Sequence, residues 1–230
     1  MDAAAPAPDH LAPDPLAPGL TLRQAARAMA ERDPVIAKLV ALDGLPRIAP
    51  FQEGHFPALV RSITYQQIAG AAARAIHGRL VAAVGGEVTP ERILALSDQE
   101  LRAAGLSGNK AASVRDLSAK VLDGTVILEP RRLARLSSDE VTARLSTVRG
   151  IGPWSAQVFE LFQLKRPDIW LTGDLGVRQG YGLAFGIPTP TPKQLEPLGD
   201  PYRPYRSVLT WYCWVAARHY AGSTAADVAS

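Results

Sequence analysis

The sequence predicts an all-α fold, and three features of its 230 residues carry that prediction. Helix-start signals recur, in which a Ser or Thr stands three residues before a Glu or Gln. Apolar residues between these signals repeat at the spacing of one helix face, as in Val208, Trp211 and Val215. Alternating, strand-like patterns are scarce, and Thr125–Leu128 is the only plausible extended segment. We therefore expect roughly ten short helices and no sheet of consequence.

The first 19 residues alternate Pro and Ala, a composition that neither forms a helix nor buries a core. We expect a disordered tail over residues 1–19 and a flexible tail over residues 223–230. Between them, capping boxes and Thr-Pro pairs predict helix starts, because a side-chain oxygen caps the first amides and a first-turn proline needs no amide partner. The capping boxes are Thr21–Gln24, Ser97–Glu100 and Ser137–Glu140, and the Thr-Pro pairs are Thr89–Pro90 and Thr191–Pro192.

The composition is that of an ordinary globular protein, with 47% hydrophobic and 20% charged residues. A chain of this length buries one substantial core or two closely packed lobes. The net charge of +3 does not indicate a uniformly basic surface. Two arginine clusters are candidates for phosphate contacts: Arg131, Arg132 and Arg135 form one, and Arg203 and Arg206 form the other.

Cysteine and histidine usage argues against a metal centre. The one cysteine, Cys213, lies in an apolar stretch and excludes an intrachain disulfide and an iron–sulfur cluster held by four cysteines. The four histidines are scattered without the spacing of metal ligands, so no catalytic metal is indicated. No apolar run is long enough to span a bilayer, and the N-terminus lacks a secretory signal. We expect a soluble, cytoplasmic protein that does not bind membranes.

Residues 145–156 predict a helical hairpin. An apolar helix end at Leu145 leads into Gly150 and Gly152, and Pro153 stands where a new helix would begin. Such a turn points backbone N–H groups outward at a helix N-terminus, which suits a phosphate. A plain turn between two helices has the same pattern, so the hairpin alone leaves its ligand open.

Asp174 lies 18 residues after Ala156 and directly follows Gly173. An aspartate in that position is typical of a helix N-cap, a role that does not exclude catalysis. Asp168 follows Pro167 in a polar turn and is interpreted as structural.

Four stretches occur in order: Ile63–Gly70, Gly105–Leu117, Leu145–Ala156 followed by Asp174, and Tyr205–Ser207 followed by Trp214. Together they resemble the alkylpurine (3-methyladenine type II, AlkA-type) branch of the helix-hairpin-helix DNA glycosylases. The resemblance covers about residues 50–220 and implies two helical lobes with a DNA-facing cleft between them. It implies a glycosylase domain over residues 20–222, with lobe A at about 20–49 and 180–222, lobe B at about 50–179, and the hairpin at 138–164.

The resemblance assigns the chemistry to Asp174. Cleavage of an N-glycosidic bond makes an oxocarbenium-like sugar, and a carboxylate near C1′ stabilises that charge and orients the attacking water. Trp154 and Trp214 match the aromatic residues of the base pocket, and Tyr65 is expected to line the same cleft. Val158 departs from the family, which has a tyrosine there in a well-known member, and this should open the pocket.

Trp154 stands where relatives that also nick the strand carry a lysine, and Lys165 lies one helix further on. The resemblance therefore implies a monofunctional enzyme that leaves an abasic site.

The resemblance also implies DNA contacts. Gln66 and Gln67 are expected to open a helix at the cleft, and Gln67 is the chosen wedge for the gap that the extruded nucleotide leaves. Backbone amides of Gly150, Ile151 and Gly152 would bind a phosphate. Arg149 replaces the usual proline and would add a phosphate contact. No cofactor is expected, apart from a structural monovalent cation at the hairpin.

These expectations describe a monomeric base excision repair enzyme whose partner is double-stranded DNA containing alkylated purines of the 3-methyladenine type. Two alternatives stay open. One is a glycosylase for deaminated or otherwise damaged bases, since the fold and the aspartate are shared. The other is a non-catalytic DNA-binding module that keeps only the hairpin.

Overall fold

The protein is described by a computed structural model that covers residues 16–48, 53–68 and 70–221. All regular structure in this described part is helical, comprising thirteen α-helices and one 3-10 helix. Residues 125–128, the expected extended segment, form no strand. The predicted all-α fold is confirmed.

Local sequence signals set several of the helix starts. All three expected capping boxes are formed, so that each N-cap hydroxyl and the side chain three residues later satisfy one another's backbone amides. The helices that begin this way are α1 (Leu22–Ala30), α6 (Asp98–Ala103) and α9 (Ser138–Leu145). Both Thr-Pro pairs also begin helices, α5 (Pro90–Ala95) and α12 (Pro192–Leu198).

The chain divides into two compact units, one of residues 1–48 with 166–230 and one of residues 49–165. We call them unit 1 and unit 2. The expected division placed residues 166–179 in lobe B, whereas the structure places them in unit 1. The reason is that residues 166–169 bind the helix α13 (Arg206–His219) of unit 1 through several hydrogen bonds. Asp174 and Trp214 therefore share a unit.

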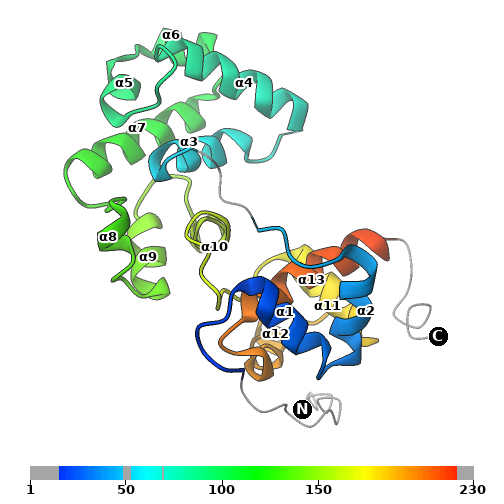
Figure 1. The fold of residues 1–230 in the computed structure, drawn as a ribbon. Coiled ribbons are helices and arrows are strands. Elements are labelled where there is room, and N and C mark those ends of the chain that lie inside the picture. The colour runs from blue at the N-terminus through cyan, green and yellow to red at the C-terminus, as the bar shows by residue number, and fades with distance from the viewer. Residues whose placement is uncertain (1–15, 49–52, 69, 222–230) are drawn as a thin grey trace, which may run out of the picture. The chain divides into compact units, whose positions relative to one another are not determined.

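Unit 2 is built around the helix α7 (Gly108–Leu122), which packs against α5 and α6 on one side and α3 (His55–Tyr65) on the other (Figure 1). Val114 and Leu117 of α7 are completely buried in its apolar core. Burying a side chain of this size contributes about 1.5–3 kcal/mol. The remaining helices of this unit are α4 (Gly70–Ala83), α8 (Pro130–Leu133), α9 (Ser138–Leu145) and α10 (Pro153–Phe162).

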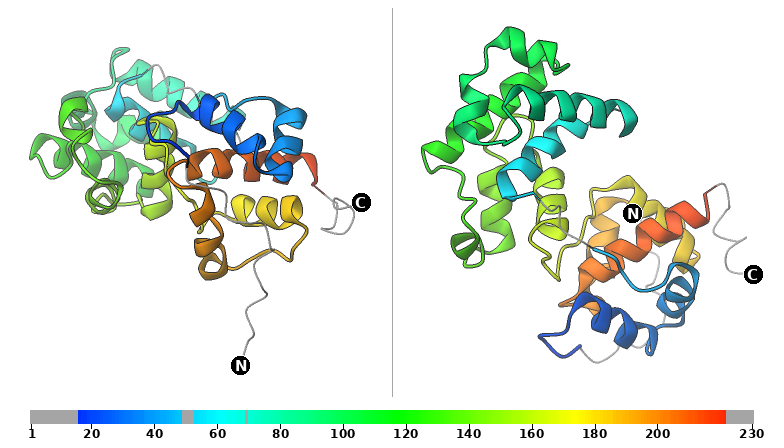
Figure 2. Two further views of the ribbon diagram at one scale, coloured as in Figure 1. Left: turned by 60° about the horizontal axis from the view of Figure 1, so that its bottom comes forward. Right: turned by 45° about the horizontal axis from the view of Figure 1, so that its top comes forward.

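Unit 1 is organised around α13 (Figure 2). This helix lies between α11 (Leu175–Phe185) and the pair formed by α1 and α2 (Pro34–Asp43). Residues 206–210, 212, 213, 215 and 216 of α13 are buried, as expected for a helix enclosed by others. The other elements of this unit are α12 (Pro192–Leu198) and the 3-10 helix η1 (Asp200–Tyr202).

The expected N-terminal tail needs a correction. Residues 1–15 lie outside the described residues, as do residues 222–230, which contain the expected C-terminal tail. Residues 16 and 17, however, contact the rest of unit 1. Leu16 is buried, and the Ala17 carbonyl accepts a hydrogen bond from the Tyr205 hydroxyl at 2.9 Å. The apolar side chain of Leu16 thus joins the core, where the Pro/Ala composition predicted none.

The contact between α11 and α13 is unusually close at Gly180. A Cβ atom added to Gly180 would lie 1.7 Å from the backbone oxygen of Cys213 and 2.5 Å from its carbonyl carbon. Because backbone atoms cannot move aside as a flexible side chain can, only glycine fits here without separating the two helices.

We expect Gly180→Ala to lower the free energy of unfolding by about 3 kcal/mol, because overpacking against backbone costs at the upper end of its usual range. Gly78→Ala in α4 is the matched control, since a Cβ there meets nothing within 4 Å. That variant should gain about 0.5–1 kcal/mol from helix propensity. Urea denaturation followed by circular dichroism measures both values, and equal stability of the two variants would contradict the close contact.

Candidate functional site

Asp174 is the N-cap of α11, and its carboxylate is held from two sides. Oδ1 accepts a hydrogen bond from the Val177 amide at 2.8 Å, which confirms the capping interpretation. The same oxygen accepts a second hydrogen bond from the indole Nε1 of Trp214 at 3.1 Å. Asp174 itself is half-buried. A carboxylate with these two donors is restricted in its rotation and partly open to a ligand.

Trp214 reaches Asp174 from α13, where it is half-buried. Its ring lies beside Gly176, where an added Cβ would be 3.3 Å from Trp214 Cδ1. The neighbouring residue Cys213 is buried, as the sequence predicts. Burial raises the pKa of the Cys213 thiol, and the negative charge of Asp174 raises it further. A protonated, inaccessible thiol has no nucleophilic role here.

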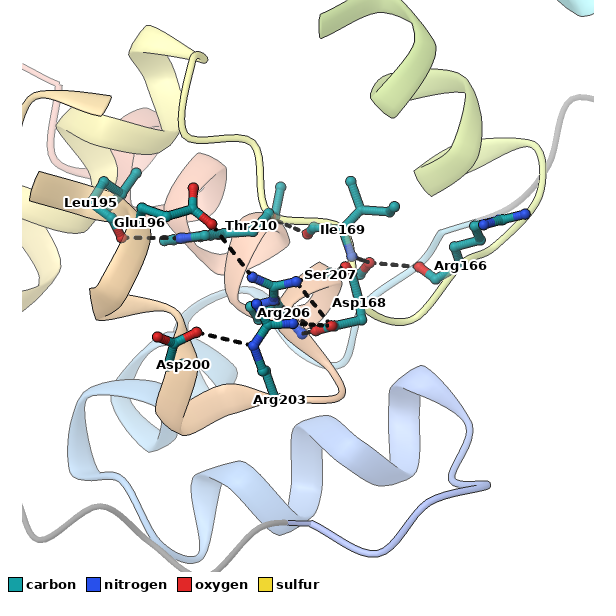
Figure 3. Close-up of polar contacts among 11 residues, drawn as sticks. Arg166, Asp168, Ile169, Leu195, Glu196, Asp200, Arg203, Arg206, Ser207 and Thr210 are labelled. Atoms are coloured by element: carbon teal, nitrogen blue, oxygen red, sulfur yellow. Dashed lines mark hydrogen bonds and ion pairs between the residues drawn. The ribbon is translucent and has the colours of Figure 1, made fainter. Parts of the chain in front are cut away.

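An ion-pair network holds the segment that leads to Asp174 (Figure 3). Arg206 Nε and Nη2 donate to the two carboxylate oxygens of Asp168 at 2.8 and 2.9 Å. Arg203 Nη1 donates to Asp168 Oδ2 at 2.9 Å, and Arg203 Nε donates to Asp200 at 3.0 Å. Asp168 is therefore structural, as predicted. The expected phosphate contact is wrong for Arg206, whose side chain is only 10% exposed and is bound bidentately.

Hydroxyl groups of α13 complete this attachment (Figure 3). The Ser207 hydroxyl donates to the carbonyl of Arg166 at 2.6 Å and accepts from the amide of Ile169 at 2.9 Å. One turn later, the Thr210 hydroxyl donates to the Ile169 carbonyl at 3.0 Å. These bonds explain why an Arg-Ser pair precedes Trp214 in the sequence: both residues fasten residues 166–169 to α13.

The predicted hairpin joins α9 to α10 through residues 146–152. Gly150 has a φ of +77°, and a Cβ there would lie 2.6 Å from the Ser113 hydroxyl oxygen. Glycine is therefore required at this position. Ile151 is buried in the core of unit 2 and anchors the turn. Gly152 has a φ of −96°, and a Cβ there meets nothing within 4 Å, so the fold itself does not require glycine at this position.

Two hairpin amides are available to a ligand. Within the described residues, no acceptor contacts the N–H groups of Gly150 and Gly152, and no side chain caps α10. Ile151 differs from the expectation, because its amide donates to the Val148 carbonyl at 3.0 Å. Its expected phosphate contact through that amide is wrong in this structure, since the turn itself uses the donor. Ile151 contributes by burial instead.

Side chains of α7 brace the hairpin. Asp116 Oδ2 accepts from the Arg149 amide at 2.7 Å and pairs with Lys120 at 2.8 Å. Partial burial acts to raise the pKa of Asp116, but the hydrogen bonds from Lys120 and the Arg149 amide outweigh it and lower that pKa. The exposed Arg149 guanidinium donates to the Asn109 side chain at 3.2 Å. The Gly105–Leu117 stretch is part of the family resemblance in the sequence. The sequence did not predict that its side chains hold the hairpin through Arg149.

Gln66 and Gln67 do not open a helix. Gln66 is the C-cap of α3, and Gln67 follows in the turn with a φ of +57°, which ends the helical conformation. Gln66 Nε2 donates to the Gly150 carbonyl at 3.0 Å and so joins this turn to the hairpin. Gln67 is exposed. A left-handed conformation at a non-glycine residue costs energy and is typical of functional turns.

The expected pocket residues fall into both units. Trp154, at the second position of α10, is 47% exposed, and Val158 is half-buried one turn further along. Tyr65 is half-buried, with the Arg61 guanidinium carbon 5.1 Å from its ring centroid and the His77 ring at 6.2 Å. These residues belong to unit 2, whereas Asp174 and Trp214 belong to unit 1.

Comparison with known proteins identifies the family. The model of the HhH-GPD superfamily base excision DNA repair proteins matches residues 60–204. The chain belongs to this superfamily. DNA-3-methyladenine glycosylase 1 of Schizosaccharomyces pombe is 30% identical to it over 172 residues, which cover 74% of this chain and 73% of that protein.

Two solved structures resemble this HhH-GPD chain along most of its length. DNA-3-methyladenine glycosidase from Bacillus halodurans has a TM-score of 0.77 at 30% identity, and the match covers 87% of this chain and 92% of that one. The 3-methyladenine DNA glycosylase of Schizosaccharomyces pombe, in complex with abasic DNA, has a TM-score of 0.73 at 28% identity. That match covers 83% of this chain and 95% of the yeast protein. The predicted family and fold are confirmed.

Within the described residues of this HhH-GPD chain, no helix is long and apolar enough to cross a membrane. No group of three or more His, Cys, Asp or Glu side chains in the same residues is arranged to hold a metal ion.

Proposed function

We propose that this HhH-GPD protein is a monofunctional DNA glycosylase that removes alkylated purines of the 3-methyladenine type and leaves an abasic site. The observation that carries the proposal is Asp174, held at the start of α11 by two hydrogen bonds. Relatives along most of the chain are named 3-methyladenine glycosylases, which supports this substrate class.

Asp174 supplies the charge that the reaction needs. As the bond from C1′ to the departing base breaks, positive charge develops on the sugar, and a fixed carboxylate beside it stabilises that charge. The same carboxylate orients a water molecule for attack at C1′ and accepts its proton. Because Val177 and Trp214 already hold Oδ1, the group needs little reorganisation during the reaction.

Trp154 and Gln67 supply recognition of the damaged nucleotide. Alkylated purines carry positive charge, and an indole face attracts a cation by about 0.5–2 kcal/mol. Trp154 presents an exposed indole next to the hairpin amides. Removing a base requires its extrusion from the stack, and the exposed Gln67 fills the gap in the duplex.

The hairpin binds the phosphate backbone of the duplex. The amides of Gly150 and Gly152 bind a phosphate, and Arg149 adds a charged contact beside them. Four carbonyls of the turn each accept a hydrogen bond in the free protein, those of Thr147, Val148, Gly150 and Gly152. A monovalent cation, which the family resemblance implies here, would be held by carbonyl oxygens of the turn, because a carbonyl that accepts one hydrogen bond keeps a second lone pair.

Loss of negative charge at Asp174 should abolish base release. We expect Asp174→Asn to release 3-methyladenine from methylated duplex DNA at least 100-fold more slowly than the wild type, because removing one key electrostatic group costs roughly that factor. Chromatography of the released bases measures the rate, and fluorescence anisotropy checks that DNA binding persists. Base release at the native rate would show that another group performs the chemistry. If the wild type released deaminated or oxidised bases and no alkylated purine, the enzyme would belong to another substrate class.

The product strand should stay intact. Trp154 has no amine for a Schiff base, and Lys120 of unit 2 is bound to Asp116 and Thr147. We expect strand breaks only after alkali or heat, and no protein–DNA adduct after borohydride treatment. A trapped adduct would overturn the monofunctional assignment, and Lys110 would be the first lysine to substitute, since partial burial lowers the pKa of its amine.

Phosphate binding at the hairpin can be tested without disturbing the fold, because Gly152 tolerates a Cβ in the free protein. We expect Gly152→Ala to weaken binding of damaged and undamaged duplexes by about tenfold, because the added methyl group would keep the phosphate from the amide and so cost a hydrogen bond to a charged group. Arg149→Ala should make the salt dependence shallower by about one counterion.

Gly78→Ala, which also adds a methyl group in open space, is the control for these two variants. If Gly152→Ala and Arg149→Ala both bind DNA with native affinity and native salt dependence, the hairpin is only a structural turn.

A further inference from the structure

The carboxylate of Asp174 receives hydrogen bonds from two different helices. Val177 belongs to α11, the helix that Asp174 caps, whereas Trp214 belongs to α13. A single donor would leave the carboxylate free to swing about its side-chain torsions. The Val177 amide and the Trp214 indole nitrogen both donate to Asp174 Oδ1, at 2.8 and 3.1 Å. Together they fix the direction of the carboxylate and its distance from α13.

The path of α13 is set one residue before Trp214. Its backbone at Cys213 rests on Gly180, where an added Cβ would lie 1.7 Å from the Cys213 oxygen. One turn back on α11, Gly176 leaves room for the hydrogen-bonded pair, since a Cβ there would be 3.2 Å from Asp174 Oδ1 and 3.3 Å from Trp214 Cδ1. Two glycines on one face of α11 thus make the space that brings the indole to the carboxylate.

The first turns of α13 hold the same segment of chain. Arg206 and Ser207 bind residues 166–169, only a few residues before Asp174. The segment is therefore attached to α13 at both of its ends, by the Arg206–Asp168 pair at its start and by Trp214 at its finish. An arrangement with this many specific contacts on one short segment exceeds what a simple helix cap requires.

We propose that Trp214 is a positioning residue, which acts on the reaction by hydrogen-bonding Asp174 through its indole N–H. This inference rests on the proposed function of Asp174 and goes beyond it, because the family resemblance assigns Trp214 to the wall of the base pocket. A role in the wall of the base pocket requires only the aromatic ring of Trp214. Positioning needs the N–H group, and a carboxylate displaced by even 1 Å can lose about 100-fold in rate.

Phenylalanine separates these two roles, since it keeps an aromatic ring and removes the N–H donor. We expect Trp214→Phe to slow single-turnover release of 3-methyladenine about tenfold. Its affinity for a duplex with a stable abasic-site analogue should stay within twofold of the wild type. Trp211→Phe is the matched control, because Trp211 is on the same helix and its buried indole nitrogen has no hydrogen-bond partner among the described residues. It should keep the native rate.

A second measurement needs no catalysis. Hydrogen exchange of the four indole N–H groups can be followed by NMR in the free protein, with signals assigned from single Trp→Phe variants. We expect Asp174→Ala to speed exchange of the Trp214 indole N–H at least tenfold. The Trp170 indole, which donates to the Leu195 carbonyl at 3.1 Å in the same unit, should be unchanged.

A native rate for Trp214→Phe would overturn the inference, and so would unchanged exchange of the Trp214 indole in Asp174→Ala. If Asp174→Ala accelerated hydrogen exchange equally at the Trp214 and Trp170 indole N–H groups, the variant would loosen unit 1 as a whole. That result would also contradict a specific bond between Trp214 and Asp174. If the wild type released no alkylated base, the proposed function would fail. The exchange experiment would then still decide whether Trp214 holds Asp174.

Discussion

Where α13 crosses α11, the backbone of Cys213 lies against Gly180, and the candidate site depends on this contact. It sets the distance at which Trp214 meets Asp174. Any side chain at Gly180 would separate the helices and withdraw the indole from the carboxylate. A packing constraint in the core of unit 1 therefore determines the position of the group that we assign to catalysis.

The hairpin of unit 2 uses a different principle, in which side chains satisfy some backbone groups and leave others unpaired. The Asp116 carboxylate accepts a hydrogen bond from the Arg149 amide, and the Gln66 side chain donates one to the Gly150 carbonyl. The side chain of Ile151 is buried. Among the described residues the amides of Gly150 and Gly152 stay unpaired in a turn that is already fixed, which is why we propose them as the phosphate contact. Rigid, unpaired donors bind a phosphate at a small entropic cost.

Local patterns in the sequence predicted the fold well. Capping boxes and Thr-Pro pairs set helix starts, because the atoms involved are only a few residues apart. The hairpin and Asp174 were likewise found from glycine, proline and spacing. Family resemblance supplied the functional interpretation of these positions.

The features that the sequence did not predict depend on contacts between distant residues. Asp168 and Arg206 are far apart in the chain, so their pairing, and the burial of an arginine expected at a phosphate, could not be read from either residue alone. The same holds for the bond from Trp214 to Asp174 and for the inclusion of residues 166–179 in unit 1. The left-handed turn at Gln67 lacks the glycine that usually signals one.

The most direct test of the central claim is a crystal structure of the protein bound to a duplex that contains a stable abasic-site analogue. We expect the Asp174 carboxylate within about 3–3.5 Å of the position of C1′, in the geometry of a reacting pair. We also expect Trp214 still to donate to Asp174 in that complex. A complex in which Asp174 faces away from the sugar, with a different side chain beside C1′, would contradict the role that we assign to Asp174.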